Sequence, residues 1–355
     1  MELWLSILIT LIKILVVLGV FLGIGAYLTW FERKLAGHIQ ARIGPKLVGP
    51  FGLLQPLADG IKLLTKESVI PQNADKPVYY LAVVMAVAPA LLLFSVIPFG
   101  PGFKLFGYEI KPIISDVNIA LLLVFAFGSL AVYGTIFSGW ASNSKYAFIG
   151  SLRKSAVVIS YEVVLGFSVL GVILLAGTMS TTGIVQAQIE RGVWFIVYQP
   201  VAFILYLFCM LAESGRVPFD IQEAEAELVT GYNVEYGGMR FGVFPLAEWY
   251  LNVMALSAIA VVLFFGGWSG PPIFGPLSPY LWFLIKMFAL VFFVLWLHWT
   301  LPRFQARDIT EIGWKIMLPI SIVNVVATAI VALRVWWTAW YINIHGYYPI
   351  HALKG

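Results

Sequence analysis

Apolar residues occur in eight long runs, separated by polar segments, along the 355 residues of the chain. Each run is close to the length that an α-helix needs to cross a bilayer, roughly 20 residues. The runs cover residues 3–31, 78–99, 119–137, 157–176, 194–211, 246–265, 280–299 and 318–340. The pattern predicts an all-α, polytopic membrane helix bundle with eight transmembrane helices, forming a single integral membrane domain over residues 1–355.

Lysine and arginine gather in every second connection between these runs. The first, third, fifth and seventh connections hold fifteen of them, whereas the other connections and the C-terminal tail hold four. Basic residues accumulate on the inner side of membrane proteins. We therefore expect both termini on the outer face, and we attribute the net charge of +4 to this topology rather than to nucleic-acid binding.

The first inner connection, residues 32–77, contains an amphipathic pattern. Leucine and isoleucine recur with helical spacing from residue 53 to residue 64, and the charged residues fall off this apolar stripe. Such a stripe predicts an amphipathic helix lying at the membrane interface. It is either an ordinary anchor or one wall of an entrance for a lipid-soluble molecule. The polar residues at that entrance would be Glu32, Arg33, Asp59 and Lys62.

The fifth connection, between residues 212 and 249 and also on the inner side, is acidic and rich in aromatic residues. It holds seven carboxylates against two arginines, in a chain of which 11% is charged. If residues 221–228 form a helix, Glu223 and Glu227 share one face at a spacing at which like charges repel. The segment is either a solvated acidic connection or part of a site that exchanges protons.

Three carboxylates lie at or inside the inner ends of three different predicted spans. Glu162 falls within the fourth span, Glu213 ends the fifth, and Glu248 begins the sixth. Ionisable residues at membrane depth are costly and usually functional. We therefore expect these acids to form one proton relay, with structural pairing to nearby arginines or hydroxyls as the alternative.

Cysteine and histidine are scarce. Cys209 is the one cysteine, and the four histidines show no paired spacing. This usage excludes internal disulfides and predicts that the chain ligates no iron–sulfur cluster, haem or metal ion by itself.

Six segments together carry a family resemblance. They are ERK at 32–34, RIGP at 42–45, GLLQPLADGIKLL at 52–64, GWASNSKY at 139–146, ISYE at 159–162 and AESGRVPFDIQEAEAELVTGYNVEY at 212–236. With these segments in this order, the chain resembles the H-subunit family of the proton-pumping NADH:quinone oxidoreductases, respiratory complex I.

The resemblance implies a membrane subunit that forms the quinone-reduction chamber with the hydrophilic arm and begins an acidic proton path. Inner loops 32–77 and 212–245 would form the quinone entrance and the cavity wall. The resemblance assigns Glu32, Arg33, Gln55, Asp59 and Lys62 to the entrance, and Arg216, Phe219, Asp220, Glu223 and Glu225 to the cavity. It assigns Glu162, Glu213, Glu227 and Glu248 to the proton path.

The same resemblance implies partners and a location. Quinone would be the substrate, with iron–sulfur clusters and flavin in partner subunits only. The partners would be the hydrophilic-arm subunits that carry the quinone site and the terminal iron–sulfur cluster, small membrane subunits and antiporter-like subunits, in the inner membrane of a prokaryotic cell. One alternative is the equivalent subunit of a ferredoxin-, F420- or hydrogenase-linked proton pump, and a more distant one is a stand-alone ion transporter.

Some positions depart from the family pattern. Ser129 stands where some members carry a carboxylate in the third span. His298 stands where an arginine is expected, and residues 305–308 differ from the expected string. We expect His298 to face either the quinone entrance or the lipid head groups.

Overall fold

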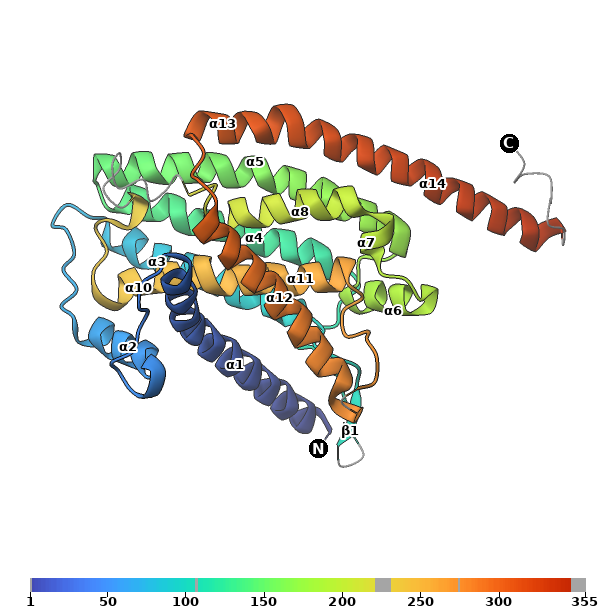
Figure 1. The fold of residues 1–355 in the computed structure, drawn as a ribbon, viewed down its shortest axis with the longest axis horizontal. Helices are drawn as coiled ribbons and strands as arrows, with labels where there is room; N and C mark the ends of the chain where they lie inside the picture. The colour runs from blue at the N-terminus through green and yellow to red at the C-terminus, as the bar shows by residue number, and fades with distance from the viewer. Residues whose placement is uncertain (1, 106–107, 221–230, 274, 346–355) are drawn as a thin grey trace.

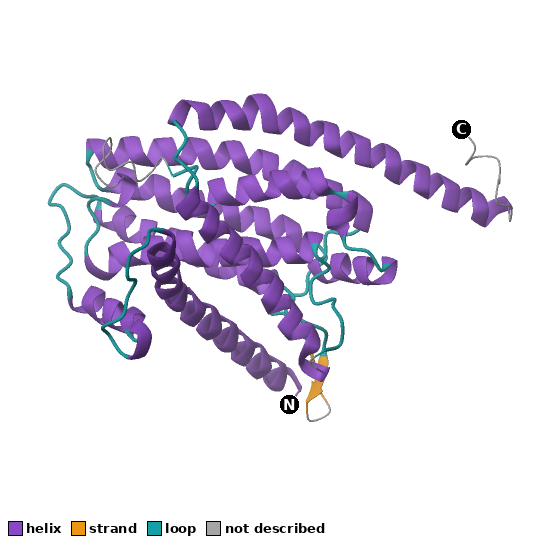
Figure 2. Ribbon diagram, viewed as in Figure 1, coloured by secondary structure: helices purple, strands orange, loops and turns teal. Residues whose placement is uncertain are grey.

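The computed structural model describes residues 2–105, 108–220, 231–273 and 275–345, and nearly all of them are helical (Figures 1 and 2). The long helices are α1 (Glu2–Ile39), α3 (Lys76–Leu93), α4 (Ala120–Ala141), α5 (Lys145–Ala176), α8 (Pro200–Glu213), α11 (Val253–Phe264), α12 (Ser278–Thr300) and α14 (Leu318–His345). The shorter helices are α2 (Gln55–Thr65), α6 (Thr181–Arg191), α7 (Phe195–Tyr198), α10 (Gly238–Pro245) and α13 (Ala306–Glu311). The 3-10 and π segments are η1 (Pro50–Gly52), η2 (Phe94–Val96), η3 (Gly231–Asn233), η4 (Leu246–Asn252), η5 (Gly275–Leu277) and η6 (Ile312–Met317).

The predicted all-α membrane bundle is confirmed, with two differences in detail. Among the described residues, seven helices are long and apolar enough to cross a membrane, whereas the sequence predicted eight. The structure also contains one small antiparallel hairpin of β1 (Phe103–Leu105) and β2 (Tyr108–Ile110), which the sequence pattern did not predict.

The predicted fifth span, 194–211, is the one that does not form a single helix long enough to cross a membrane. It is divided into the four-residue helix α7 and the 14-residue helix α8. The break lies at Gln199, whose φ of −130° and ψ of 52° are not helical, directly before Pro200. Proline lacks a backbone N–H and disfavours the helical conformation in the residue before it. At 1.5 Å per residue, α8 is roughly 21 Å long.

Helix α11 forms the centre of the bundle. Every residue from Val253 to Phe264 is buried. A helix that is apolar on all sides is expected in the core rather than at an interface. Helices α5, α8 and α12 pack around it, while α1 crosses the bundle at an angle and is largely exposed (Figure 1).

The two ends of the bundle differ in character. Helices α2 and α10 lie at one end, and β1 and α6 lie at the other (Figure 1). The start of α1 and the end of α14 lie toward the end that holds β1 and α6. The predicted amphipathic helix at 53–64 is confirmed as α2, which packs against α10 and α1.

Candidate functional site

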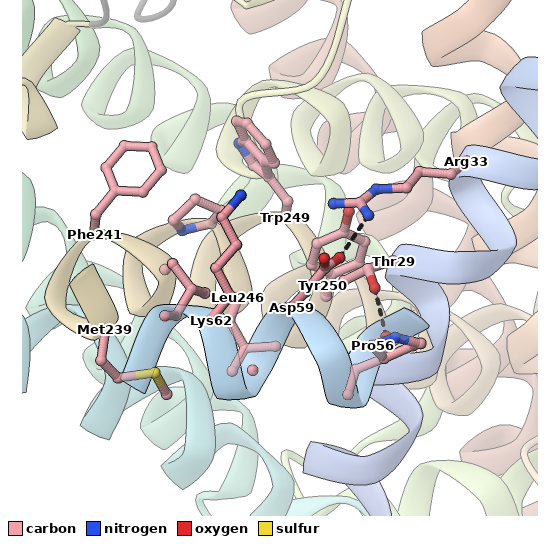
Figure 3. A pocket seen from close by; sticks show the side chains of 15 residues that line it. Thr29, Arg33, Pro56, Asp59, Lys62, Met239, Phe241, Leu246, Trp249 and Tyr250 are labelled. Atoms are coloured by element: carbon pink, nitrogen blue, oxygen red, sulfur yellow. Dashed lines mark hydrogen bonds and ion pairs between the residues drawn. The ribbon is translucent and has the colours of Figure 1, made fainter. Parts of the chain in front are cut away.

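A pocket of about 450 Å³ lies between α1, α2, α10 and the π-helical segment η4. Figure 3 shows Met239, Phe241 and Leu246 on one side of it, and Arg33 and Asp59 on the other. The pocket therefore combines apolar walls with a charged end. Small-molecule sites commonly have this composition, because a few polar groups orient a ligand that is otherwise held by apolar contacts.

The charged end is built by one face of α2 and the adjoining turn of α1. Arg33 Nη1 lies 2.5 Å from Asp59 Oδ2, and Gln55 Nε2 donates to Asp59 Oδ1 at 2.9 Å. Lys62 also lines the pocket. Residues 55, 59 and 62 share a face because their spacing matches the helical repeat. Three of the predicted entrance residues thus line one pocket, and Gln55 contacts it through Asp59.

Glu32 does not line this pocket. It is 5% exposed and forms a two-pronged ion pair with the buried Arg216, at 2.5 and 3.0 Å. The Arg216 guanidinium also donates to the Trp249 carbonyl at 3.1 Å, and it lies 5.3 Å from the ring centres of Trp249 and Tyr250. Because both of these aromatic residues line the pocket, the ion pair lies directly behind the pocket wall.

The charge of Arg216 is well stabilised. Burial by itself lowers the pKa of Arg216, but the charge and hydrogen bonds of Glu32, together with Tyr250, raise it above its ordinary value. A fully buried ion pair with two parallel hydrogen bonds is geometrically demanding. Arg216 therefore behaves as a fixed cation behind the pocket.

The loop after α8 is fastened to the end of α12. The Val217 N–H donates to His298 Nδ1 at 3.1 Å, and His298 Nε2 lies 3.8 Å from Glu32 Oε1. Asp220 pairs with Arg303 at 2.7 Å. His298 thus faces Glu32 and this loop rather than the lipid head groups.

Phe219 is buried beside this loop. Its ring makes edge contacts with Tyr161 at 5.1 Å and Phe304 at 5.9 Å between centroids. These contacts hold the loop against α5 and the segment after α12. The predicted site residues Glu223, Glu225 and Glu227, and the predicted helix at 221–228, lie outside the described residues.

Glu162 and Glu213 both lie close to one glycine of α4, Gly128. A methyl group on Gly128 would lie 3.3 Å from Glu213 Oε1 and 3.9 Å from Glu162 Oε1. Ser129, the departure from the family pattern, donates a hydrogen bond to Glu162 Oε1. Two of the three predicted relay acids are therefore neighbours, and the Ser129 hydroxyl lies beside Glu162.

Glu213 and Glu248 share a second, small cavity of about 30 Å³. Gly128 lines it as well, together with Lys154. Lys154 Nζ forms an ion pair with Glu248 Oε2, and both side chains are largely buried, at 8% and 14% exposure. The structure thus brings the three acids together in the order Glu162, Glu213, Glu248.

The segment η4 belongs to both sites. Leu246, Trp249 and Tyr250 line the larger pocket, whereas Glu248 and Asn252 line the small cavity. A π-helix widens the helical repeat, and such segments are frequent at functional sites. One seven-residue segment therefore carries a wall of the pocket and one of the acids.

The sequence reasoning did not single out Lys154, Trp249 and Tyr250. Lys154 lies two turns before Glu162 on the same helix, which was a visible signal. The aromatic pair follows Glu248 directly, but no periodic pattern distinguishes it. Among the residues that the structure describes, no group of three His, Cys, Asp or Glu side chains is placed to hold a metal ion.

Comparison with known proteins points to one family. The sequence model of the family described as NADH dehydrogenase matches residues 12–329. The chain is 80% identical over 322 residues to the H subunit of the NADH-quinone oxidoreductase of Aquifex aeolicus, covering 91% of this chain and 96% of that protein.

Two further relatives give the same result. The chain is 47% identical over 331 residues to an NADH-quinone oxidoreductase H subunit, numbered 2, of Rhizobium meliloti, covering 93% of this chain and 99% of that protein. It is 49% identical over 324 residues to an NADH-quinone oxidoreductase H subunit, numbered 1, of Geobacter metallireducens, covering 91% of this chain and 96% of that protein. By its sequence and its all-helical membrane architecture, the chain belongs to the NADH dehydrogenase family.

Proposed function

We propose that the chain is a membrane subunit of an NADH-quinone oxidoreductase, in which the pocket beside α2 admits quinone and the three acids begin a proton path. The observation that carries this proposal is that η4 lines both the pocket and the cavity of the acids. Trp249 and Tyr250 face the pocket, and Glu248 between α10 and α11 faces the acid cavity. A change in pocket occupancy that shifts η4 therefore acts directly on the position of an acid.

The chemistry of the pocket suits a quinone. Its apolar walls match an isoprenoid-bearing ring, and Arg33, Asp59 and Lys62 provide polar groups for the head. α1 and α2 border the pocket at the end of the bundle where the inner loops gather, so a ligand dissolved in the bilayer would reach it from the side. Inner loops 32–77 and 212–245 are the entrance and the cavity wall in this proposal.

The acids form a path that connects the region of the pocket with the surface of α4 and α5. A proton would pass among Glu248, Glu213 and Glu162, each of which belongs to a different helix. Ser129 is exposed at the surface of α4 beside Glu162. An exposed polar group at membrane depth is costly unless another protein covers it. This supports a neighbouring membrane subunit against α4 and α5, to which the path continues.

The redox groups belong to partner subunits in this proposal. Cys209, the one cysteine, is buried in α8, so the chain has no donor set for an iron–sulfur cluster. Iron–sulfur clusters and flavin in the hydrophilic-arm partners supply electrons, while this chain binds quinone and moves protons. Small membrane subunits and antiporter-like subunits complete the assembly.

The proposed location is the inner membrane of a prokaryotic cell, with both termini on the outer face. The excess of lysine and arginine in alternate connections supports this orientation. The ferredoxin- or hydrogenase-linked alternative and the stand-alone transporter are less favoured, because the three relatives are named as parts of NADH-quinone oxidoreductases.

The test separates quinone reduction from electron delivery. We expect Asp59→Ala to lower quinone reduction by the assembled complex roughly tenfold, since it removes the partner of Arg33 at the charged end. Electron transfer to a water-soluble artificial acceptor, which bypasses the pocket, should stay unchanged. Arg33→Ala should likewise lower quinone reduction and leave electron transfer to the artificial acceptor unchanged.

Arg307→Ala is the matched control. It also removes an arginine from an ion pair, with Glu311, but this pair is exposed and outside the pocket. Equal losses with quinone and with the artificial acceptor in the Asp59 variant would indicate failed assembly and reject the pocket as the quinone entrance.

A further inference from the structure

Lys154 is a buried cation among the acids of the proposed path. It lies on α5 two helical turns before Glu162, and its side chain is 8% exposed. Its Nζ pairs with Glu248, lies 4.5 Å from the ring centre of Tyr232 and is 3.5 Å from the Tyr232 hydroxyl. A lysine at this depth loses hydration, which the carboxylate and the aromatic face replace.

The two acids of the small cavity are therefore in unequal environments. Glu248 has a cation in direct contact. Glu213 has no ion pair or hydrogen bond among the described residues, and its Oε2 atom is buried without a partner. Lys154 therefore fixes the position of the Glu248 carboxylate, whereas no such partner fixes the position of Glu213 among the described residues.

We propose that Lys154 is a positioning residue of the proton path, which holds the Glu248 side chain at the small cavity where it exchanges a proton with Glu213. This inference rests on the proposed function of the three acids. The O–H bond at Glu213 breaks and an O–H bond forms at Glu248, so Glu213 becomes the carboxylate and Glu248 the neutral acid. The cavity between them, of about 30 Å³, accommodates one water molecule, which is enough to carry the proton.

The step also explains how the ion pair connects to the pocket. Protonation of Glu248 removes the charge that Lys154 compensates, so their attraction ends. Glu248 lies on η4 between residues that line the larger pocket. Release of the ion pair therefore frees η4 at the point where it borders the pocket, and Lys154 couples the charge of Glu248 to the position of Trp249.

The test uses the complete complex in sealed vesicles, with proton pumping measured per electron transferred. We expect Lys154→Met, which keeps the length of the side chain but removes its charge, to lower pumping roughly tenfold. Lys154→Arg should restore most of it, because an arginine supplies the same charge. Lys145→Met, at the exposed start of the same helix, is the control and should pump normally.

Two comparisons distinguish this inference from the proposed function. If Glu213→Gln and Glu248→Gln pump normally, the acidic path itself is wrong. If those variants are impaired but Lys154→Met pumps normally, the role of Lys154 is wrong. Since Lys154 acts through Glu248, the double variant Lys154→Met/Glu248→Gln should be no worse than Glu248→Gln alone.

A second measurement holds even if Lys154→Met assembles poorly. Infrared difference spectra of the native complex on quinone reduction should show a new band of a protonated carboxyl group that is missing in Glu248→Gln. In Lys154→Met, that band should be weaker or displaced, because Glu248 is no longer held at the cavity. Identical difference spectra for the native complex and Glu248→Gln would overturn the inference, as would failure of Lys154→Arg to restore pumping.

Discussion

At the scale of single residues, the charged groups inside this bundle are compensated in different ways. Glu32 and Arg216 neutralise each other completely, with two hydrogen bonds. Glu248 has Lys154, whereas Glu213 has its acidic neighbours and an unpartnered oxygen. The two-pronged pair of Glu32 and Arg216 is fixed, because breaking such a buried pair leaves an uncompensated charge at a cost of about 3–5 kcal/mol. Glu248 and Glu213 lack a two-pronged partner, and they are the acids to which we assign proton exchange.

Gly128 provides a test of the contact between Glu162 and Glu213. Its lack of a side chain leaves room for both carboxylates. We expect Gly128→Val to separate them and lower proton pumping roughly tenfold, while transfer to an artificial acceptor remains unchanged.

The control for this variant is Gly166→Val on α5. A β-carbon there would meet no atom within 4 Å, and the β-branched side chain lowers helix propensity as it does at position 128. Normal pumping by Gly128→Val, with assembly equal to that of the control, would contradict the direct relay between these acids.

At the scale of elements, polar groups decide how the apolar helices are held together. Gln199 lies at the break between α7 and α8, and its amide donates to Thr328 of α14 at 2.6 Å. It also accepts from Asn324 of α14 at 2.9 Å. Many residues of α14 are exposed and apolar, and this hydrogen-bond network is a polar attachment of the helix to the bundle.

Replacing Gln199 should loosen α14. Gln199→Met keeps the side-chain volume but removes both hydrogen bonds, and we expect a loss of about 1–2 kcal/mol of stability, the size found for interhelical hydrogen bonds in membranes. Thermal unfolding of the purified protein in detergent would measure it. Gln186→Met is the control, since Gln186 is outside the network and its side chain donates to Glu190 of its own helix at 3.2 Å. Equal melting temperatures in the two variants would argue against this attachment.

At the scale of the whole molecule, the two ends of the bundle carry different elements. The pocket, α2 and α10 lie at one end, whereas the hairpin, α6, the start of α1 and the end of α14 lie at the other. This arrangement agrees with an even number of membrane crossings. That number is reached when the shorter apolar helix α8 is counted as a crossing together with the seven longer helices. It also matches the distribution of lysine and arginine along the chain.

Topology reporters would test the orientation. Fusions after Glu67, Asn143 and Asn233 should report the inner side, because each of these positions lies in a base-rich connection. Fusions after Tyr108 and Gly270 should report the outer side. An exchanged result at either group would reverse the orientation or change the number of crossings, and the acids would then not gather on one side.

The sequence by itself determined the class of the protein and most of its elements. The length of the apolar runs predicted the spans, and the spacing of leucines predicted α2, because both depend on the local repeat of a helix. The exception is the run 194–211, in which Pro200 indicated a break in the helix. The family followed from ordered motifs, which also depend on neighbouring residues.

Only the tertiary structure decided which of the polar residues meet. Glu32 and Arg33 are adjacent in sequence, yet one pairs with Arg216, 184 residues away, and the other with Asp59 on α2. Successive residues of a helix point about 100° apart, so each contacts a different neighbour, and the identity of that neighbour depends on how the helices pack. For the same reason the sequence could show Lys154 two turns before Glu162 but not its partner, because only the packing of η4 brings Glu248 beside it.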